Sequence, residues 1–296
     1  MDFKSQLLQR KTEIDKKICQ CFENKSGLQQ TVFESMEYSL KAGGKRLRPV
    51  LLLEVCEMLG GNINDAVEFA LAIEMIHTYS LIHDDLPAMD NDDYRRGKLT
   101  NHKVYGEGIA ILAGDGLLNL AFETMIDKID RNPHLLHKGV KAMQIISKAS
   151  GVNGMIGGQV VDLECEGKKV DAQTLDFIHH HKTSVMLEAA INAGAMLGEA
   201  TEDEYEKLQN YGKCIGLAFQ IVDDILDVIG DEKKLGKKVG SDVYNEKSTY
   251  PSLYGIEESR RIVSRLIEDS RKSLEIFGEK AEFLRGLAKY LEDRDY

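Results

Sequence analysis

Apolar residues recur along the whole chain with the spacing of one helix face, and no alternating strand pattern of convincing length appears. Glycine pairs at 43–44 and 60–61, and an asparagine–proline step at 132–133, stand where helices should stop. No linker, composition break or repeat of fixed period divides the sequence. We therefore predict one all-α domain, residues 1–296, with helices over residues 3–22, 28–42, 47–59, 64–85, 107–130, 136–152, 154–166, 172–198, 202–230, 256–275 and 279–292.

Composition narrows the class of protein. Of 296 residues, 43% are hydrophobic and 29% charged, which is typical of a soluble globular protein. The 38 basic and 49 acidic residues give a net charge of −11, which disfavours nucleic acid as a partner. The longest apolar stretches, 49–56 and 66–82, are interrupted by glutamate or histidine, so we predict no membrane span. The first residues lack the apolar core of a secretory signal, and the five cysteines form no CxxC pair, so we expect a reduced, cytoplasmic protein.

The strongest local signal is QIVDDILD, residues 220–227. Its polar residues are Gln220, Asp223, Asp224 and Asp227. At 100° per residue they fall within an arc of about 100°, and the rest of the helix is almost wholly apolar. For such a motif alone, a solvated acidic face is the alternative. A buried helix with three carboxylates instead needs cations, and oxygen ligands without Cys or His favour Mg²⁺ where phosphates complete the coordination.

A second acidic segment, DDLPAMD, carries Asp84 and Asp90 on either side of Pro87. On an ideal helix Asp84 and Asp90 would lie about 240° apart. Proline disfavours a regular helix before it, so we expect the chain to bulge and bring Asp90 back beside Asp84. Upstream, His77 and Ser80 lie within about 40° of the Asp84 direction, which predicts a polar stripe on an apolar helix. The structural alternative is a helix-end aspartate and a hydrogen-bonded core histidine.

Basic residues cluster in four places. The segment GGKRLRP places its cluster after a glycine pair and at the start of a helix, where free N–H groups suit an anion. Each cluster alone is typical of a solvated surface. Together with the carboxylates they predict a ligand with two phosphorylated groups, one bound through metal and one held directly by Arg and Lys. The clusters are Lys45, Arg46 and Arg48; Arg95 and Arg96; Lys182 with Thr183; and Lys237.

GGKRLRP, HTYSLIHDDLPAMDNDDYRRG, HHHKT and FQIVDDILD stand in the order, and near the spacing, of the trans-isoprenyl diphosphate synthases. The sequence most resembles the bacterial-type farnesyl diphosphate synthases. The resemblance implies a single-domain helical bundle of the isoprenoid synthase type around a deep central cavity, with the two acidic helices facing each other across its mouth, and a homodimer. Two departures are small: Gly116 stands where relatives often have alanine, and the tail EDRDY matches poorly, which leaves any role of Arg294 open.

The resemblance also implies the reaction. An allylic diphosphate, dimethylallyl or geranyl, ionises, its carbocation alkylates isopentenyl diphosphate, and the released pyrophosphate accepts the last proton. By the same resemblance, Mg²⁺, or Mn²⁺ in its place, is held on the allylic diphosphate by Asp84, Asp90 and Asp223, with Asp85, Asp224 and Asp227 as supporting or shared ligands. Arg95, Lys182 and Lys237 would stabilise the leaving group. Lys45, Arg48, His77 and Arg96 would bind the second diphosphate without metal, and Thr183, Phe219 and Gln220 would face the cation.

Product length depends, in the resembling family, on bulky residues just before the first aspartate motif. Here those positions are Tyr79 and Ser80. Tyr79 precedes Asp84 by about 7.5 Å of helix rise, a depth that a lengthening prenyl chain must pass. An ideal helix puts Tyr79 about 140° from Asp84, so it meets the chain only if the cavity curves around the helix. Serine is too small to block, so Tyr79 predicts fifteen-carbon farnesyl diphosphate; geranylgeranyl diphosphate is the alternative.

Two other classes of protein compete with this assignment. An HD-type metal phosphohydrolase would use His77, the His83-Asp84 dipeptide and a distant aspartate, but it leaves GGKRLRP and DDILD unexplained. A non-catalytic subunit of a longer-chain synthase would have degenerate aspartate motifs, whereas both are intact here. The histidines at 179–181 point about 100° apart on a helix, so we expect no metal there. Gln159 and Asp162 either line the cavity or serve packing.

Overall fold

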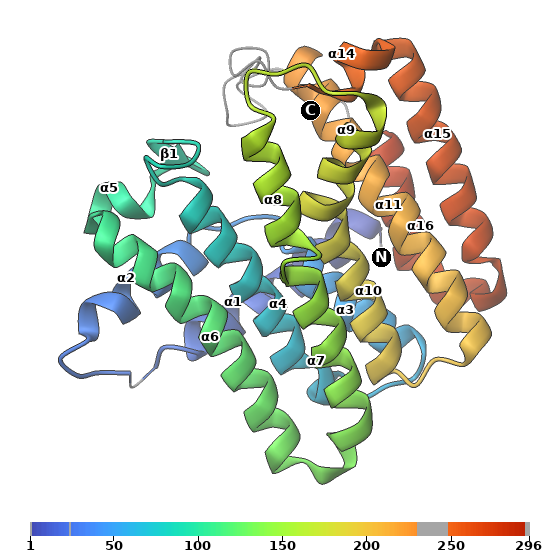
Figure 1. Cartoon of the computed structure of the whole chain (residues 1–296). Coiled ribbons are helices and arrows are strands. Elements are labelled where there is room, and N and C mark those ends of the chain that lie inside the picture. The colour runs from blue at the N-terminus through green and yellow to red at the C-terminus, as the bar shows by residue number, and fades with distance from the viewer. Residues whose placement is uncertain (1, 24, 230–247, 294–296) are drawn as a thin grey trace.

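The computed structural model describes residues 2–23, 25–229 and 248–293 (Figure 1). These residues form an all-α fold with one minimal hairpin. The helices are α1 (Phe3–Gln20), α2 (Gln30–Leu40), α3 (Leu47–Met58), α4 (Ile63–Asp84), α5 (Asn101–Tyr105), α6 (Glu107–Arg131), α7 (Leu136–Ser150), α8 (Met155–Glu164), α9 (Ala172–Ile178), α10 (Val185–Leu197), α11 (Glu202–Ile229), α14 (Tyr250–Tyr254), α15 (Ile256–Ser273) and α16 (Glu282–Glu292). The remaining elements are the short helices η1 (Pro133–Leu135), η2 (His179–Ser184) and η3 (Glu275–Ala281) and the strands β1 (Tyr94–Arg95) and β2 (Lys98–Leu99).

Side-chain caps fix several helix starts where the sequence places Asp, Asn or Thr. Asp2 accepts a hydrogen bond from the Ser5 N–H at 2.8 Å at the start of α1. Asp171 does the same for the Thr174 N–H at 2.8 Å, and Asn62 caps α4. Each cap satisfies one of the free N–H groups that a helix start leaves exposed.

The predicted all-α fold is confirmed, with two differences in detail. The continuous helix expected over 172–198 is interrupted, because η2 is a π-helical turn between α9 and α10. The last helix also begins later than expected, after η3, where Gly278 breaks the helix with φ of +53°. The short helices α5 and α14 and the hairpin β1–β2 were not predicted, since elements of two to five residues carry too little periodicity.

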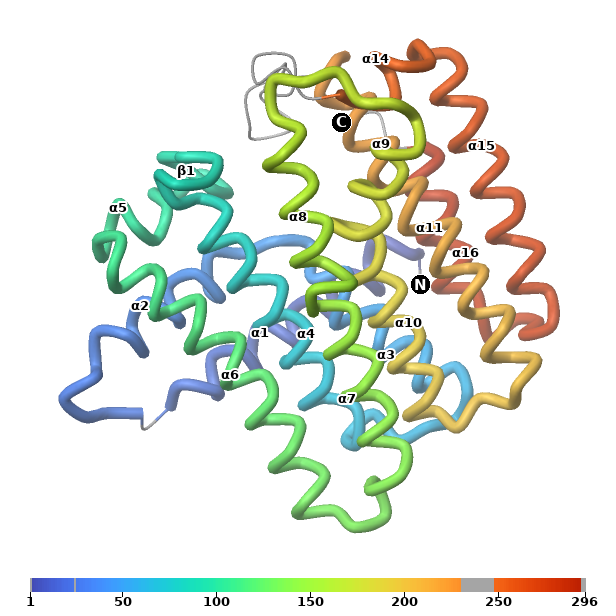
Figure 2. Tube along the Cα trace, viewed as in Figure 1, coloured from blue at the N-terminus to red at the C-terminus, as the bar shows by residue number. Residues whose placement is uncertain are grey.

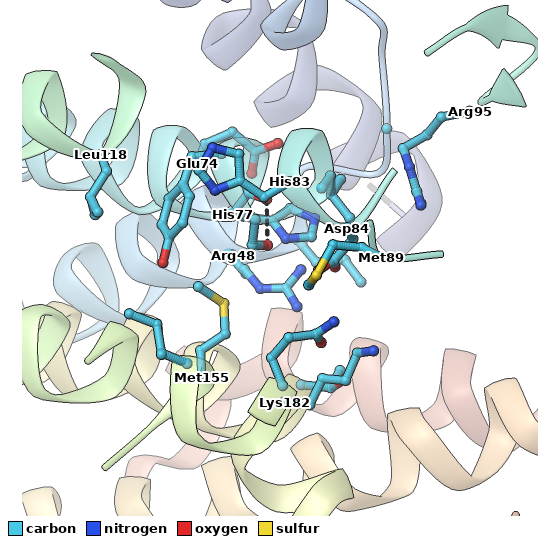
Figure 3. A pocket seen from close by; sticks show the side chains of 18 of the residues that line it. Arg48, Glu74, His77, His83, Asp84, Met89, Arg95, Leu118, Met155 and Lys182 are labelled. Carbon is cyan, nitrogen blue, oxygen red and sulfur yellow. Dashed lines mark hydrogen bonds between the residues drawn. The ribbon is translucent and has the colours of Figure 1, made fainter. Parts of the chain in front are cut away.

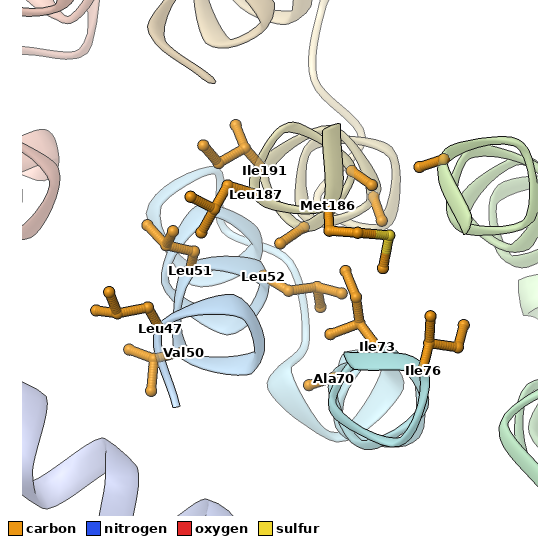
Figure 4. Close-up of a cluster of buried hydrophobic side chains, with 14 of the residues drawn as sticks. Leu47, Val50, Leu51, Leu52, Ala70, Ile73, Ile76, Met186, Leu187 and Ile191 are labelled. Atoms are coloured by element: carbon orange, nitrogen blue, oxygen red, sulfur yellow. The ribbon is translucent and has the colours of Figure 1, made fainter. Parts of the chain in front are cut away.

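Helix α10 lies at the centre of the bundle and contacts α3, α4, α7 and α11. Figure 4 shows the apolar side chains of α3, α4 and α10 meeting between these helices, with Leu52, Ile73 and Met186 among them. All three are buried. Because this core joins the helices that carry the sequence motifs, it fixes their relative positions.

Two long helices bring their acidic ends to one end of the molecule. α4 packs along α6 on one side of the bundle, and α11 packs along α15 on the other. In Figure 1 and Figure 2 the hairpin β1–β2, which follows α4, lies at the same end of the molecule as α9 and α14. The bundle therefore presents the carboxyl ends of α4 and α11 near each other.

Helix α6 is the one helix in the described ranges that is long and apolar enough to cross a membrane by length and composition. Core helices of water-soluble proteins pass the same test, and α6 packs against α2, α4 and α7. Its other face leaves Ile111, Leu112 and Ile126 exposed. We therefore treat α6 as a packed helix with an apolar outer face.

Candidate active site

The first acidic segment folds back on itself after α4. The Asp90 N–H donates to the Asp84 carbonyl at 2.8 Å, and the Asn91 N–H donates to the Leu86 carbonyl at 3.1 Å. The chain leaves the helix just before Pro87. The predicted bulge that returns Asp90 to the level of Asp84 is therefore confirmed at the backbone.

Asp84 and Asp85 point into different surroundings. Asp84 lines the large cavity, and its burial raises the pKa of the carboxyl to about 6, with Lys182 opposing the shift and Asp90 adding to it. Asp85 is buried and accepts from the Arg95 guanidinium at 2.5 Å. Burial raises the pKa of Asp85 in spite of that ion pair. Only the first of the two adjacent aspartates faces the cavity.

The acidic stripe of α11 is divided in the same way. Phe219, Gln220 and Asp223 line the cavity. Asp224 is buried and bonds the protein instead: His179 Nε2 lies 2.8 Å from it, and the Gln220 amide donates to it at 2.9 Å. The Tyr250 N–H donates to the same carboxylate at 3.0 Å, and Asp227 is fully buried. Asp223 is therefore the member of DDILD that faces the cavity.

The π-helical turn η2 places Lys182 and Thr183 in the cavity wall. π-Helical turns insert one residue into a helix and are frequent at functional sites. Lys182 Nζ lies 2.5 Å from Asp162 Oδ2 on α8. Gln159 lines the cavity, and Asp162 lines a smaller pocket behind Lys182, so both residues of GGQVVD lie at the site.

The three consecutive histidines have separate partners. His179 contacts Asp224, His180 Nδ1 lies 3.1 Å from Glu188, and His181 Nδ1 lies 2.9 Å from the Phe177 carbonyl. These divergent contacts agree with the expected 100° spacing.

A basic wall lines the polar end of the cavity and is made by Lys45, Arg48, His77, Arg95 and Arg96. Burial lowers the pKa of Arg48 to about 10, with Glu74 opposing the shift and Arg96 adding to it. Burial, with Arg48 and the other arginines nearby, lowers the pKa of His77 well below its usual value. The buried Nε of Arg48 has no hydrogen-bond partner among the described residues. A buried donor without a partner in a positive pocket suits an anionic ligand.

Gly44 gives Arg96 access to this wall. Its φ is +123°, and a Cβ there would lie 2.6 Å from the Arg96 Cζ, so a larger residue would displace the guanidinium. Arg96 in turn donates to the Gly43 carbonyl. Gly44 of GGKRLRP is thus needed for close approach, and Gly43 for its positive φ of +97°.

Arg46 also lines the cavity, but carboxylates of the protein bind its guanidinium. It is 3% exposed, has a left-handed φ of +53°, and bonds Glu74 at 2.6 Å and Asp15 at 2.9 Å. Glu74 also lines the cavity, although it lies outside the sequence motifs. A buried acid three positions before His77, on one helix stripe, was the available signal.

The cavity measures about 840 Å³ and has a polar and an apolar end. Figure 3 shows Arg48, Asp84 and Lys182 gathered together, with Leu118 and Met155 away from them on the other side. Tyr79 and Ser80 both line the cavity, so it curves around α4 far enough to reach the tyrosine. Gly116, on α6, faces Met36 rather than the cavity, and a Cβ there would lie 2.9 Å from the Met36 sulfur.

The donor set fits a metal that is held partly by its ligand. Among the described residues, no three His, Cys, Asp or Glu side chains lie close enough to hold an ion by themselves. Asp84 and Asp223 line the cavity from α4 and α11, and Asp90, which is not a lining residue, returns beside Asp84 at the backbone. Mg²⁺ commonly takes one or two carboxylates and completes its shell with phosphate and water. Burial is the main cause of the raised pKa of Asp84, and a bound cation would oppose that shift. Lys237 and Arg294 lie outside the described residues.

This fold and this cavity define a class of protein, the all-α isoprenoid synthases. The chain belongs to the polyprenyl synthetase family, whose family model matches residues 29–281, and it is a prenyltransferase. Because the chain belongs to this family, it is not an HD-type phosphohydrolase.

Three relatives show how similar the chain is to known members. It is 51% identical over 272 residues to a dimethylallyltranstransferase of Fischerella ambigua, covering 92% of this chain and 78% of that protein. It is 48% identical over 265 residues to a geranylgeranyl diphosphate synthase of Cyanophora paradoxa, covering 89% and 88%. The crystal structure of a FPP/GFPP synthase from Zymomonas mobilis superposes with a TM-score of 0.86 at 36% identity, covering 97% and 98%. These names span several product lengths.

Proposed function

We propose that the protein condenses isopentenyl diphosphate head-to-tail with dimethylallyl or geranyl diphosphate and releases mainly farnesyl diphosphate and pyrophosphate. The observation that carries this proposal is the position of Tyr79. Its ring lines the same cavity as Asp84, and it is only 6% exposed, so it stands where the apolar end would otherwise continue. Similarity to geranylgeranyl diphosphate synthases favours a twenty-carbon product as the second candidate.

The allylic diphosphate would bind between α4 and α11. Asp84, Asp90 and Asp223 would hold Mg²⁺, or Mn²⁺ in its place, and the bound metal would offset charge that develops on the departing pyrophosphate. Lys182, fixed by Asp162, and Arg95, fixed by Asp85, would add positive charge on the protein side.

Residues of η2 and α11 would stabilise the allylic cation. Thr183 and Gln220 line the cavity beside Phe219, where oxygen lone pairs and a π face attract a cation. The apolar walls keep water from it, and no side-chain base is required because pyrophosphate can accept the proton.

Isopentenyl diphosphate would bind at the basic wall without metal. Lys45, Arg48 and Arg96 would donate charge-assisted hydrogen bonds. His77 stays neutral at ordinary pH because its pKa is lowered, and a bound dianion beside it would favour the protonated form.

Product identification tests the proposal. We expect purified enzyme, given isopentenyl diphosphate, each allylic primer and Mg²⁺, to make mainly fifteen-carbon product, and Tyr79→Ala to shift it to twenty carbons or longer. Ser80→Ala is the matched control, which should leave the product unchanged since serine is too small to block. A wild-type enzyme that makes mostly geranylgeranyl diphosphate, or an unchanged Tyr79→Ala product, would refute the fifteen-carbon assignment. Absence of any condensation by the chain alone would favour a non-catalytic subunit.

We further propose a homodimer formed through α6. Ile111, Leu112 and Ile126 are 45%, 56% and 52% exposed and fall within about 100° on one side of the helix. An apolar face of this kind on one long helix suits a second copy of the same face. The five cysteines are free, which supports a reduced compartment such as the cytoplasm.

A further inference from the structure

Behind Tyr79, the His83 imidazole fills the seam between α4 and α6. Its Nε2–H donates to the Ile111 carbonyl on α6 at 3.1 Å. Its ring meets the Tyr79 ring edge to face, with centroids 5.7 Å apart. Both residues line the main cavity, and Figure 3 shows His83 above its apolar end.

Gly114 makes this position of the His83 imidazole possible. A Cβ on Gly114 would lie 2.1 Å from His83 Nε2, so only glycine lets the imidazole pack directly against the backbone of α6. The histidine is therefore held from two sides, by a hydrogen bond to one residue of α6 and by close packing on another.

Nothing polar holds the Tyr79 ring. Its hydroxyl is buried without a hydrogen-bond partner among the described residues. The direction in which the ring points is consequently set by packing alone, and the imidazole edge is the aromatic neighbour against which it rests. Removing that neighbour opens space beside the ring, into which the ring can turn.

We propose that His83 is a positioning residue that sets product length by holding Tyr79 across the cavity. The proposal rests on the proposed function, in which Tyr79 limits chain growth. It adds that the barrier is a pair of rings supported by α6, rather than a single side chain on α4.

The test compares product ratios, which a general loss of activity or stability would not change. His83→Ala should raise the ratio of twenty-carbon to fifteen-carbon product by about tenfold, the change that about 1.4 kcal/mol between two barriers produces. His83→Gln can still donate to the Ile111 carbonyl and fill part of the seam but has no ring edge, so its ratio should lie between those of the wild type and His83→Ala. His134→Ala, a histidine on the surface far from the motif, is the control. Should His83→Ala be insoluble, His83→Ser carries the same expectation.

Failure of this inference is distinguishable from failure of the proposed function. If Tyr79→Ala lengthens the product while His83→Ala and His83→Ser leave the ratio unchanged, the tyrosine limits length without the histidine, and the inference is wrong. If Tyr79→Ala itself changes nothing, the proposed function is wrong. A wild-type ratio in His83→Gln would also overturn the pair of rings, because glutamine keeps the hydrogen bond but lacks the ring edge.

Discussion

Asp84 and Asp85 have the same side chain but lie in different surroundings. Asp223 and Asp224 show the same difference on α11. In each pair the first aspartate lines the cavity and the second is buried against protein donors, Arg95 in one case and His179 in the other. Consecutive residues on a helix point about 100° apart, so two adjacent aspartates can lie in different surroundings.

We predict metal dependence from Asp84 and Asp223, the members of these pairs that line the cavity. Asp84→Ala and Asp223→Ala should each lower turnover by orders of magnitude while the helical fold is retained, because each removes a carboxylate from a shell that phosphate must complete. Steady-state rates with Mg²⁺, and circular dichroism, provide the measurement. Asp127→Ala, an exposed aspartate on α6, is the control. Full wild-type activity in excess chelator would contradict the metal assignment.

Mutations in the basic wall should affect the binding of a different substrate from mutations among the carboxylates. Arg48→Ala, and likewise Lys45→Ala, should weaken apparent affinity for isopentenyl diphosphate by roughly 10-fold to 100-fold, since a hydrogen bond to a charged group contributes about 1.5–3 kcal/mol. The KM for geranyl diphosphate should change much less. Lys237→Ala is expected to act mainly on kcat. Equal effects of these variants on both substrates would show that the basic residues are wrongly divided.

His77 predicts a pH dependence of stability in the ligand-free enzyme. Its pKa is lowered in the folded state, so the unfolded chain binds the proton more readily, and folding loses free energy as pH falls below about 6.5. His77→Gln removes this pH-dependent contribution to the free energy of unfolding. The difference in unfolding free energy between wild type and variant, from urea titrations, should be constant above about pH 6.5 and should move in favour of the variant below it. Parallel curves at all pH values would mean that His77 is not buried as a neutral group.

At the scale of elements, two local irregularities position the site. The π-helical turn η2 lies where His179 reaches Asp224 on α11, and it directs Lys182 and Thr183 to the cavity. The start of α3 is anchored by Arg46, which ties it to α1 through Asp15 and to α4 through Glu74. Both irregularities exchange regular helix geometry for contacts between helices.

Arg46 should therefore matter for stability as well as for binding. Arg46→Met leaves Glu74, which is 2% exposed, without its guanidinium, and breaking a buried ion pair from one side costs about 3–5 kcal/mol. Arg131→Met, which removes an exposed pair with Asp127 on α6, should cost less than about 1 kcal/mol. Chemical denaturation of both variants gives the comparison. Similar losses in the two would show that burial of the Arg46 pair has no special weight.

At the scale of the whole molecule, the apolar side of α6 is a face that the packing of the described residues does not cover. Leu112→Glu together with Ile126→Glu should convert a dimer into a monomer, because two charges would be buried in each copy of a self-complementary interface. Sedimentation velocity measures the change. Leu8→Glu, at another exposed leucine on α1, is the control and should remain dimeric. A wild-type monomer at micromolar concentration would exclude the proposed dimer.

Much of this protein can be predicted from the sequence because its signals are local. Apolar spacing gives the long helices, and Pro87 gives the bulge that returns Asp90 to Asp84. Many of the motif residues that fall within the described ranges line one cavity, including Lys45, Arg48 and Gln220, whereas Asp85, Asp90, Asp224 and Asp227 do not. Within a motif, the helical repeat and the proline already fix the relative directions of side chains, whatever the rest of the chain does.

What only the tertiary structure decided depends on contacts between distant segments. The buried position of Arg46 depends on Glu74 and Asp15. The π-helical turn lies at the contact between His179 and Asp224. The pairing of His83 with Tyr79 requires Gly114 on α6. The sequence also left open whether Tyr79 meets the cavity, which depends on how far the cavity curves around α4. Spacing along one helix gives directions about its own axis, but it carries no information about which neighbour lies in each direction, and burial and pairing are set by that neighbour.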